Sequence, residues 1–138
     1  TMSLSNASES DALDIFLEGT DPAWRTGATG YLALVTGASV DEAAPLTNEC
    51  TYTGYARVAQ TKATAWSGSG DTRTNANLVQ WGKRTDGGAT QTATHAIWVD
   101  TASGAVNMAI IIPLDDDLPI SLNIRPQVEA GGLTVNAA

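Results

Sequence analysis

The sequence predicts a mainly β fold, a single-domain antiparallel β-sandwich of jelly-roll type with a short N-terminal helix. From Thr26 onward, short runs rich in Val, Ile, Thr, Tyr and Trp alternate with clusters of Gly, Asn, Asp and Pro, a pattern typical of sandwiches and barrels. Apolar residues follow a helical period only near the N-terminus. The 138 residues suffice for one core and are few for two. We therefore expect one domain over 1–138, with a helix at 3–18 and the sandwich at 26–138.

The N-terminal segment 3–18 is predicted to be helical. Leu13, Phe16 and Leu17 are spaced i, i+3 and i+4, which places them on one helical face. Ser8, followed three residues later by an aspartate, resembles a capping box, and Gly19 supplies a stop signal. We expect this narrow apolar stripe to pack on its own domain. A contact with a neighbouring subunit remains the alternative.

About seven or eight strand candidates follow, separated by turn signals. They include GYLALV (30–35), YTGYARVAQ (52–60), ANLVQW (76–81), TQTATHAIWVD (90–100), VNMAIII (106–112), LPISLNI (118–124) and LTVNA (133–137). The first is apolar on both faces, which suits a central strand. The polar segments 36–51 and 67–75 are expected to be loops, which serve as contact surfaces when such a domain sits in an assembly.

Composition excludes several function classes. The formal charge is −8, from 15 acidic and 7 basic residues, so the surface repels phosphate backbones and nucleic-acid binding is not expected. The longest apolar run, 108–114, is far shorter than the roughly 20 residues of a membrane span. The first residues lack the features of a secretory signal. We expect a soluble protein made in the cytoplasm, with no membrane contact and no cofactor.

No residue set points to catalysis. Cys50 is the only cysteine, which rules out an intramolecular disulfide framework. His95, the only histidine, lies in a strand candidate with the same parity as Ala93, Ile97 and Val99. The sequence has neither a G-x-S-x-G motif nor an oxyanion-hole glycine loop. We therefore predict no catalytic residue and do not expect an enzyme.

Three consecutive aspartates, Asp115 to Asp117, stand inside the segment PLDDDLP. Neighbours on an extended chain point to opposite faces, so only Asp115 and Asp117 would share one. Those two are weak candidates for calcium ligands, because such loops usually carry further acidic and Asn or Gly residues. We favour a proline-bracketed acidic connection between two strands, which keeps a strand edge in water. No metal site is predicted.

Four tryptophans are dispersed along the chain, and all but Trp24 lie in or beside strand candidates. Packing in a core or between subunits is favoured over stacking on a sugar. Interfaces draw on Trp, Tyr and Arg anchors. On residue type alone, the candidate interface residues are Tyr55, Arg57, Trp66 and Trp81.

Several short motifs occur in a recognisable order. They are SLSNASESDALDIFL (3–17), GYLALVT (30–36), Glu49 with YTGYAR (52–57), GGATQTATHAIW (87–98), ASGAV (102–106) and LTV (133–135). In this order they resemble a family of small bacteriophage virion proteins, often labelled phage tail fibre proteins, over nearly the whole chain. The sequence departs from that family at 37–50, at Asn123 in place of a turn glycine, and at Asp115 to Asp117 in place of small polar residues.

The resemblance implies a virion structural protein with no family catalytic residue. It implies as partners the major capsid protein or other virion proteins, together with other copies of the chain, and assembly into the virion in the host cytoplasm. The sequence has no heptads or β-helical repeat from which to build a fibre shaft. We therefore expect a capsid decoration (cement) protein. A tail fibre or baseplate component is one alternative, and a carbohydrate-binding module with tryptophans along a groove is another.

Overall fold

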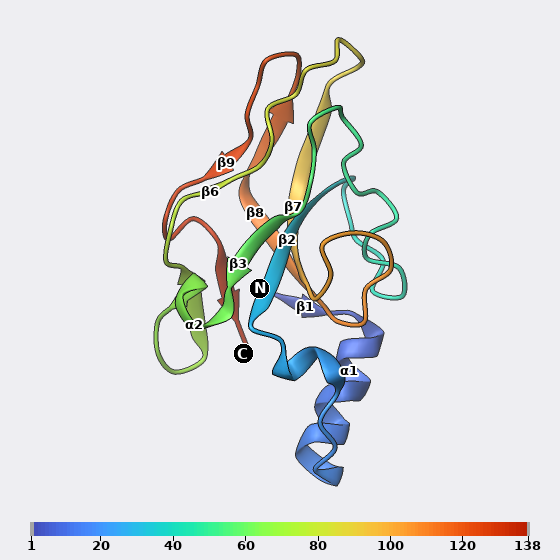
Figure 1. The fold of residues 1–138 in the computed structure, drawn as a ribbon, viewed down its shortest axis with the longest axis vertical. Helices are drawn as coiled ribbons and strands as arrows, with labels where there is room; N and C mark the ends of the chain where they lie inside the picture. The colour runs from blue at the N-terminus through green and yellow to red at the C-terminus, as the bar shows by residue number, and fades with distance from the viewer. Residues whose placement is uncertain (1, 138) are drawn as a thin grey trace.

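A computed structural model describes residues 2–137 (Figure 1). Its largest element is an antiparallel five-stranded sheet with the strand order β1-β8-β7-β2-β3. The strands are β1 (Ser3–Leu4), β8 (Ala109–Ile120), β7 (Gln91–Val99), β2 (Thr29–Thr36) and β3 (Val58–Thr61). The prediction that the GYLALV segment forms a central strand is confirmed, since β2 has a partner on each side and four consecutive buried residues, 32–35.

Two small antiparallel sheets lie on one side of the large one (Figure 1). One contains β10 (Thr134–Asn136), β5 (Thr72–Asn75) and β4 (Trp66–Ser67), and the other pairs β6 (Val79–Gln80) with β9 (Gln127–Val128). A single helical turn, α2 (Lys62–Ala65), connects β3 to β4. The mainly β, antiparallel fold class with a short N-terminal helix is confirmed, and the facing sheets are arranged as in a sandwich.

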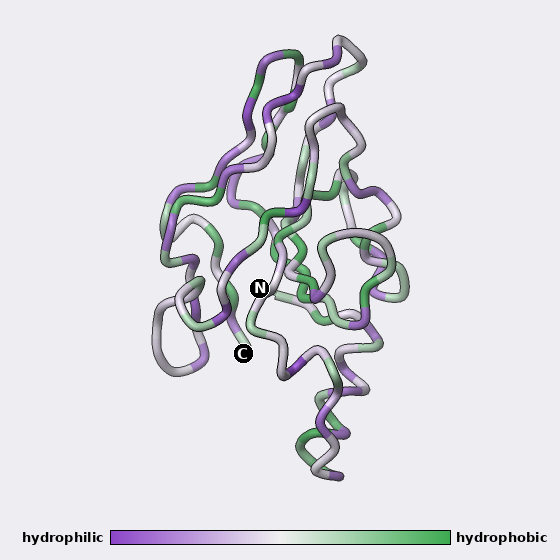
Figure 2. The backbone as a smooth tube through the Cα atoms, viewed as in Figure 1, coloured by the Kyte–Doolittle hydropathy of each residue, from purple (hydrophilic) through white to green (hydrophobic). Residues whose placement is uncertain are grey.

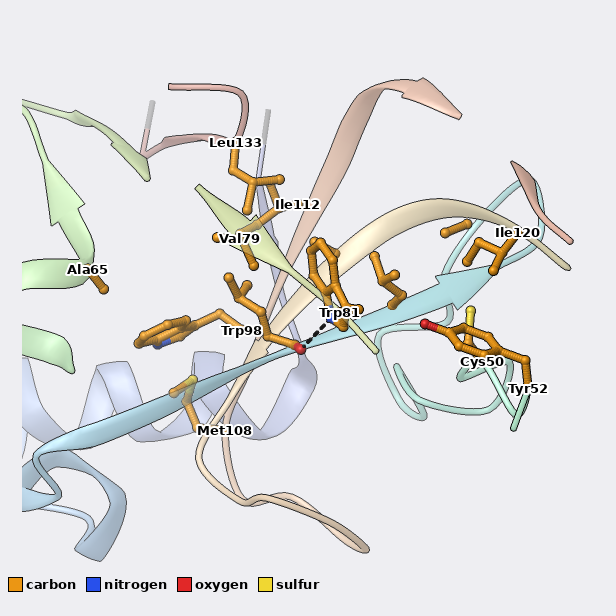
Figure 3. Close-up of a cluster of buried hydrophobic side chains, with 14 residues drawn as sticks. Cys50, Tyr52, Ala65, Val79, Trp81, Trp98, Met108, Ile112, Ile120 and Leu133 are labelled. Carbon is orange, nitrogen blue, oxygen red and sulfur yellow. Dashed lines mark hydrogen bonds between the residues drawn. The ribbon is translucent and has the colours of Figure 1, made fainter. Parts of the chain in front are cut away.

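The large sheet is buried on both faces. Its first core faces the small sheets and is centred on Trp81, whose Nε1 donates a hydrogen bond to the Leu32 carbonyl at 2.9 Å (Figure 3). Alternate residues of the same strands, such as Ala33 and Ile97, form a second core. That core is covered by residues of the loops at 37–50 and 100–108, including Leu46. Period-2 alternation of side chains therefore serves both cores, which is why the central strands are apolar throughout.

The prediction that Asp115 to Asp117 connect two strands is wrong. Residues Ala109–Ile120 form one strand, β8. His95 of β7 pairs with Pro113, whereas Ala93 pairs with Leu118. Three extra residues of β8 are thus accommodated in a bulge beside β7. Bulges insert unpaired residues into a continuing strand, which is how a charged tripeptide is tolerated here.

Strand β7 also has a bulge, next to the bulge of β8. Against β2, Val35 pairs with His95 but Thr36 pairs with Ala93, which leaves Thr94 as an extra residue. The predicted shared parity of His95 with Ala93 is therefore wrong. Ala93 lies in the first core, while His95 has the parity of Ile97 in the second. A one-residue bulge moves every side chain after it to the opposite face of the sheet, and the alternation of apolar and polar residues in a sequence does not reveal such a bulge.

The N-terminal segment is helical over a shorter range than predicted. Residues 3–4 form β1, followed by α1 (Asn6–Leu13) and a π-helical turn, η1 (Asp14–Glu18). The N-cap is Ser5 rather than Ser8, since the Ser8 amide donates to Ser5 Oγ at 3.3 Å. Ser8 is buried instead, and its Oγ accepts a hydrogen bond from the Ala109 amide. The predicted stop at Gly19 is confirmed by its left-handed φ of 67°.

Three other strand predictions were too long. YTGYARVAQ is extended only from Val58, ANLVQW only at 79–80, and LPISLNI only up to Ile120. Residues 67–75, predicted to be a loop, contribute to the β4–β5 hairpin. A short 3-10 turn, η2 (Ala23–Thr26), precedes β2. Within residues 2–137, no helix has the length and apolar character needed to cross a membrane.

Candidate assembly surface

An apolar groove of about 500 Å³ lies between the N-terminal helix and the end of the sheets. The helix contributes Ile15 and Phe16, η2 contributes Trp24, and the sheets contribute Trp66 and Trp98. Trp98 lies over Gly30, where a Cβ atom would be only 2.1 Å from the indole ring. The glycine at the start of GYLALV therefore makes room for the floor of the groove.

Polar contacts fix the walls of the groove. Trp24 Nε1 donates a hydrogen bond to Asp11 Oδ2 at 2.6 Å, which links η2 to α1. Lys62 Nζ donates to the Trp24 carbonyl at 2.8 Å, which links η2 to α2. Trp66 packs edge-on against Trp98 with ring centroids 5.4 Å apart. The groove is thus built from several elements held together, a common property of binding surfaces.

The rim of the groove is basic. Arg25, Lys62 and Arg73 line it, three of only seven basic residues in a chain of net charge −8. Arg25 is paired with Asp21, so the positive charge at the groove comes from Lys62 and Arg73, and such charge steers an acidic partner to one place.

Beside the groove, the helix carries an exposed apolar ridge formed by Leu13, Phe16 and Leu17. Their exposed fractions are 59%, 81% and 78%. The expectation that this stripe packs on its own domain is wrong. The helix projects beyond the ends of the strands, and Figure 2 shows hydrophobic residues on this projecting end. Exposed apolar clusters of this kind mark interaction surfaces.

Of the four predicted interface residues, only Trp66 lines the groove. Trp81 is fully buried in the first core. Arg57 and Tyr55 belong to a network within the chain, described below. That any of the four contacts a partner stays a prediction. The sequence analysis did not identify Trp24, Arg25 and Lys62 as residues of this surface. The available signal was that Trp24 lies outside every strand candidate and is followed directly by a basic residue, Arg25.

Glu49 is the centre of the internal network. Its carboxylate accepts hydrogen bonds from Arg57 Nε at 2.8 Å and Nη2 at 3.0 Å, and from the Tyr55 hydroxyl at 2.7 Å. Arg57 also donates to the carbonyls of Thr101 and Gly104. Burial, followed by the hydrogen bond to Glu49, raises the pKa of Tyr55 well above its usual value. These groups fasten one loop to another.

The aspartates of the β8 bulge are all exposed. Within residues 2–137, no group of three or more His, Cys, Asp or Glu side chains is arranged to hold a metal ion. Burial lowers the pKa of His95, and the carboxylate of Asp117 acts in the opposite direction. His95 Nδ1 lies 2.8 Å from the Thr94 hydroxyl. Calcium ligation by Asp115 and Asp117 stays the weak alternative that the sequence left open.

Cys50 lies in the first core, where burial raises the pKa of its thiol to about 11. A thiol with so high a pKa is a poor nucleophile at neutral pH. The structure therefore places Cys50 as a packing residue.

Comparison with known proteins gives one decisive match. A family model described as "Podophage GP4 fiber I protein gp80" covers residues 3–136. The chain belongs to this family. The resemblance seen in the sequence to small bacteriophage virion proteins is therefore confirmed, and this member of the family is a structural protein of a phage virion. No curated protein matches the chain.

Proposed function

We propose that this protein is a non-enzymatic component of a phage fibre, held in the virion by contacts through the apolar groove and the ridge beside it. The observation that carries the proposal is the match over 3–136 to a family described as a fibre protein. The groove supports it, because a structural subunit needs an exposed apolar surface to bury on assembly.

The groove favours a protein partner over a glycan. Three of the four tryptophans line it, as the carbohydrate-binding alternative would require. Its other lining side chains are largely apolar, however, including Ile15, Met108 and Val135. Sugar hydroxyls need hydrogen-bonding groups at fixed positions, whereas an apolar ridge needs only complementary shape.

Electron microscopy of virions labelled through this protein tests the proposal. An affinity tag added after residue 137 would be detected with gold particles on intact phage. The tag belongs there because β10 ends before it, at Asn136. Gold at the fibres is expected. Gold on neither the fibres nor the shell would contradict the proposed role.

Capsid decoration is the second candidate. The sequence has no heptad or β-helical repeat, which favours a short clamp on the shell over an elongated shaft. In that case the partner is the major capsid protein, and gold would cover the capsid evenly. Assembly of the virion in the host cytoplasm is part of both proposals.

A further inference from the structure

A second hollow in the surface lies where the loop at 37–50 meets the end of β2 and the start of β7. It consists of two adjoining pockets, of about 220 and 340 Å³, which share Thr36, Thr47 and Asn48. We call the two together the polar furrow. None of the residues that line it lines the apolar groove, so a contact made through the groove leaves the furrow open.

The furrow is lined mainly by neutral groups that can both donate and accept hydrogen bonds. Two carboxylates also line it, and that of Glu49 is already paired with Arg57. Among the described lining residues there is no Lys, Arg or His, so an anionic ligand would find no cation. The neutral groups are the hydroxyls of Thr36, Ser39, Thr47, Thr51, Thr90 and Thr92 and the amides of Asn48 and Gln91.

Three of these neutral groups have no partner within the chain. Across residues 2–137, no hydrogen bond engages the side-chain amide of Asn48 or the hydroxyls of Thr90 and Thr92. A hydroxyl offers one donor and two acceptor sites, and an amide offers two donors and an acceptor oxygen. The furrow therefore presents donors and acceptors together, as a ligand rich in hydroxyl groups requires.

Contacts within the chain hold the furrow in shape. The Thr36 amide donates a hydrogen bond to the Asn48 carbonyl at 2.9 Å. Gln91 Oε1 accepts from the Thr51 amide at 3.0 Å, and Gln91 Nε2 donates to Thr51 Oγ1 at 2.9 Å. The loop that forms one wall also covers the second core. A wall fixed in this way has little conformational freedom to lose when a ligand binds.

We propose that the polar furrow binds a neutral glycan. Hydroxyl groups of the sugar bond to Asn48, Thr90 and Thr92, and its C–H face lies against Val40 and Pro45, which line the same furrow. Asn48 lines both pockets and is the central contact. The inference goes beyond the proposed function, because it adds a ligand site to a subunit whose apolar groove serves assembly.

Two-dimensional NMR of the isotope-labelled full chain tests the proposal. Maltose, lactose, cellobiose and N,N′-diacetylchitobiose serve as neutral probes in separate titrations. At least one of them should shift the side-chain amide resonance of Asn48 and the backbone amides of 36–51 and 90–92. The indole resonances of Trp66 and Trp98 report on the apolar groove. If no probe shifted the furrow residues, or if the shifts were confined to these indoles, the proposal would be overturned.

Two substitutions test the contacts themselves. Asn48→Ala and Thr92→Val should each raise the dissociation constant of the sugar about fivefold or more, since each removes hydrogen-bonding groups of the site. Asn77→Ala and Thr134→Val are matched controls, because both residues are exposed and lie outside the furrow and the groove. The amide spectrum of each variant shows whether its fold is kept.

Normal binding by both furrow variants, or an equal loss in the controls, would contradict the assigned site. Sugar binding in solution and gold position on virions are measured separately, so failure of the glycan site is distinguishable from failure of the fibre role.

Discussion

At the scale of single residues, the structure explains the motif YTGYAR, which resembled the family signature. Tyr52 donates its hydroxyl hydrogen to the Gly82 carbonyl at 2.8 Å, and burial raises its pKa to about 12. Gly54 has φ +104°, and a Cβ atom there would lie 2.2 Å from the Lys83 carbonyl oxygen. Tyr55 and Arg57 both reach Glu49. The motif is thus a structural fastening between distant loops.

Replacing Arg57 by alanine tests this fastening. The Arg57 side chain is 4% exposed in its ion pair with Glu49, so its loss leaves the Glu49 carboxylate without its cation and with the Tyr55 hydroxyl as its remaining side-chain donor, and it takes the guanidinium donor from two carbonyls. The free energy of unfolding should fall by about 3 kcal/mol, measured by urea denaturation. Arg25→Ala is the control, because the Arg25–Asp21 pair is more than half exposed and should contribute less than about 1 kcal/mol. Equal losses would contradict the structural role.

Gly54→Ala should also destabilise the protein. The substitution combines a strained positive φ with a clash against the Lys83 backbone, and should lower the free energy of unfolding by at least about 2 kcal/mol. Gly70→Ala separates the two effects. Gly70 has φ +66° and open space around it, so only the conformational cost of roughly 1 kcal/mol applies. If both variants lost the same stability in thermal or urea unfolding, the clash with the Lys83 backbone would contribute nothing to the effect of Gly54→Ala.

At the scale of elements, the sequence predicted strands well where apolar runs are long, and poorly elsewhere. The runs around Leu32, Ile97 and Ile111 were placed correctly, because burial on both faces leaves a continuous apolar signal. The run beginning at Tyr52 was overestimated, because its aromatic residues serve the loop fastening. The bulges at Thr94 and in β8 were not predictable, since they come from strand pairing and not from local propensity.

The acidic bulge protects an open sheet edge. Strand β1 covers β8 only at Ile110 and Ile111, and the aspartates lie farther along the same strand. Charges on an edge discourage pairing with another chain. Changing Asp115, Asp116 and Asp117 to serine should leave the fold intact and increase aggregation on prolonged incubation, measured by thioflavin T fluorescence.

A triple lysine variant at the same positions is the control for net charge. It reduces the formal negative charge of the molecule more than the serine variant does, yet it keeps the edge charged. If edge charge protects the strand, the lysine variant stays soluble. Greater aggregation of the lysine variant than of the serine variant would instead assign the effect to net charge.

At the scale of the whole molecule, the fold class and the virion role were predictable from the sequence, and the assembly surface was not. The groove gathers Phe16, Trp24, Trp66 and Trp98 from four separate elements, and only their packing in three dimensions makes it visible. Trp81 has the same residue type as an interface anchor but lies in the first core. Composition therefore identified suitable residue types without telling inner from outer positions.

The overall stability should depend on pH through His95. Burial lowers its pKa below the ordinary 6.5 in the folded state, so the unfolded chain binds the proton first as the pH falls. The free energy of unfolding should therefore decrease as the pH drops below that ordinary value, and increase as the pH rises back towards it. Urea denaturation between about pH 5 and pH 7.5 checks this dependence.

Asp117→Asn provides the specific test of that dependence. The carboxylate of Asp117 raises the pKa of His95 against the effect of burial, so its removal should lower that pKa further. Because the chain has a single histidine, an NMR titration reads the change from one resonance. Asp41→Asn, a change of the same charge in the 37–50 loop, should leave the resonance unshifted. A rise in the pKa after Asp117→Asn would contradict the assigned geometry.

The paired bulges divide the β7–β8 hairpin into two independent ladders. One joins 95–99 to 109–113 between the two cores, and the other joins 91–93 to 118–120 at the far end. Between them the register shifts, so no hydrogen-bonded ladder runs through the junction. The far ladder can therefore open while the near one remains closed. Amide hydrogen exchange should show two protection classes within one hairpin, with faster exchange at 91–93 than at 95–99.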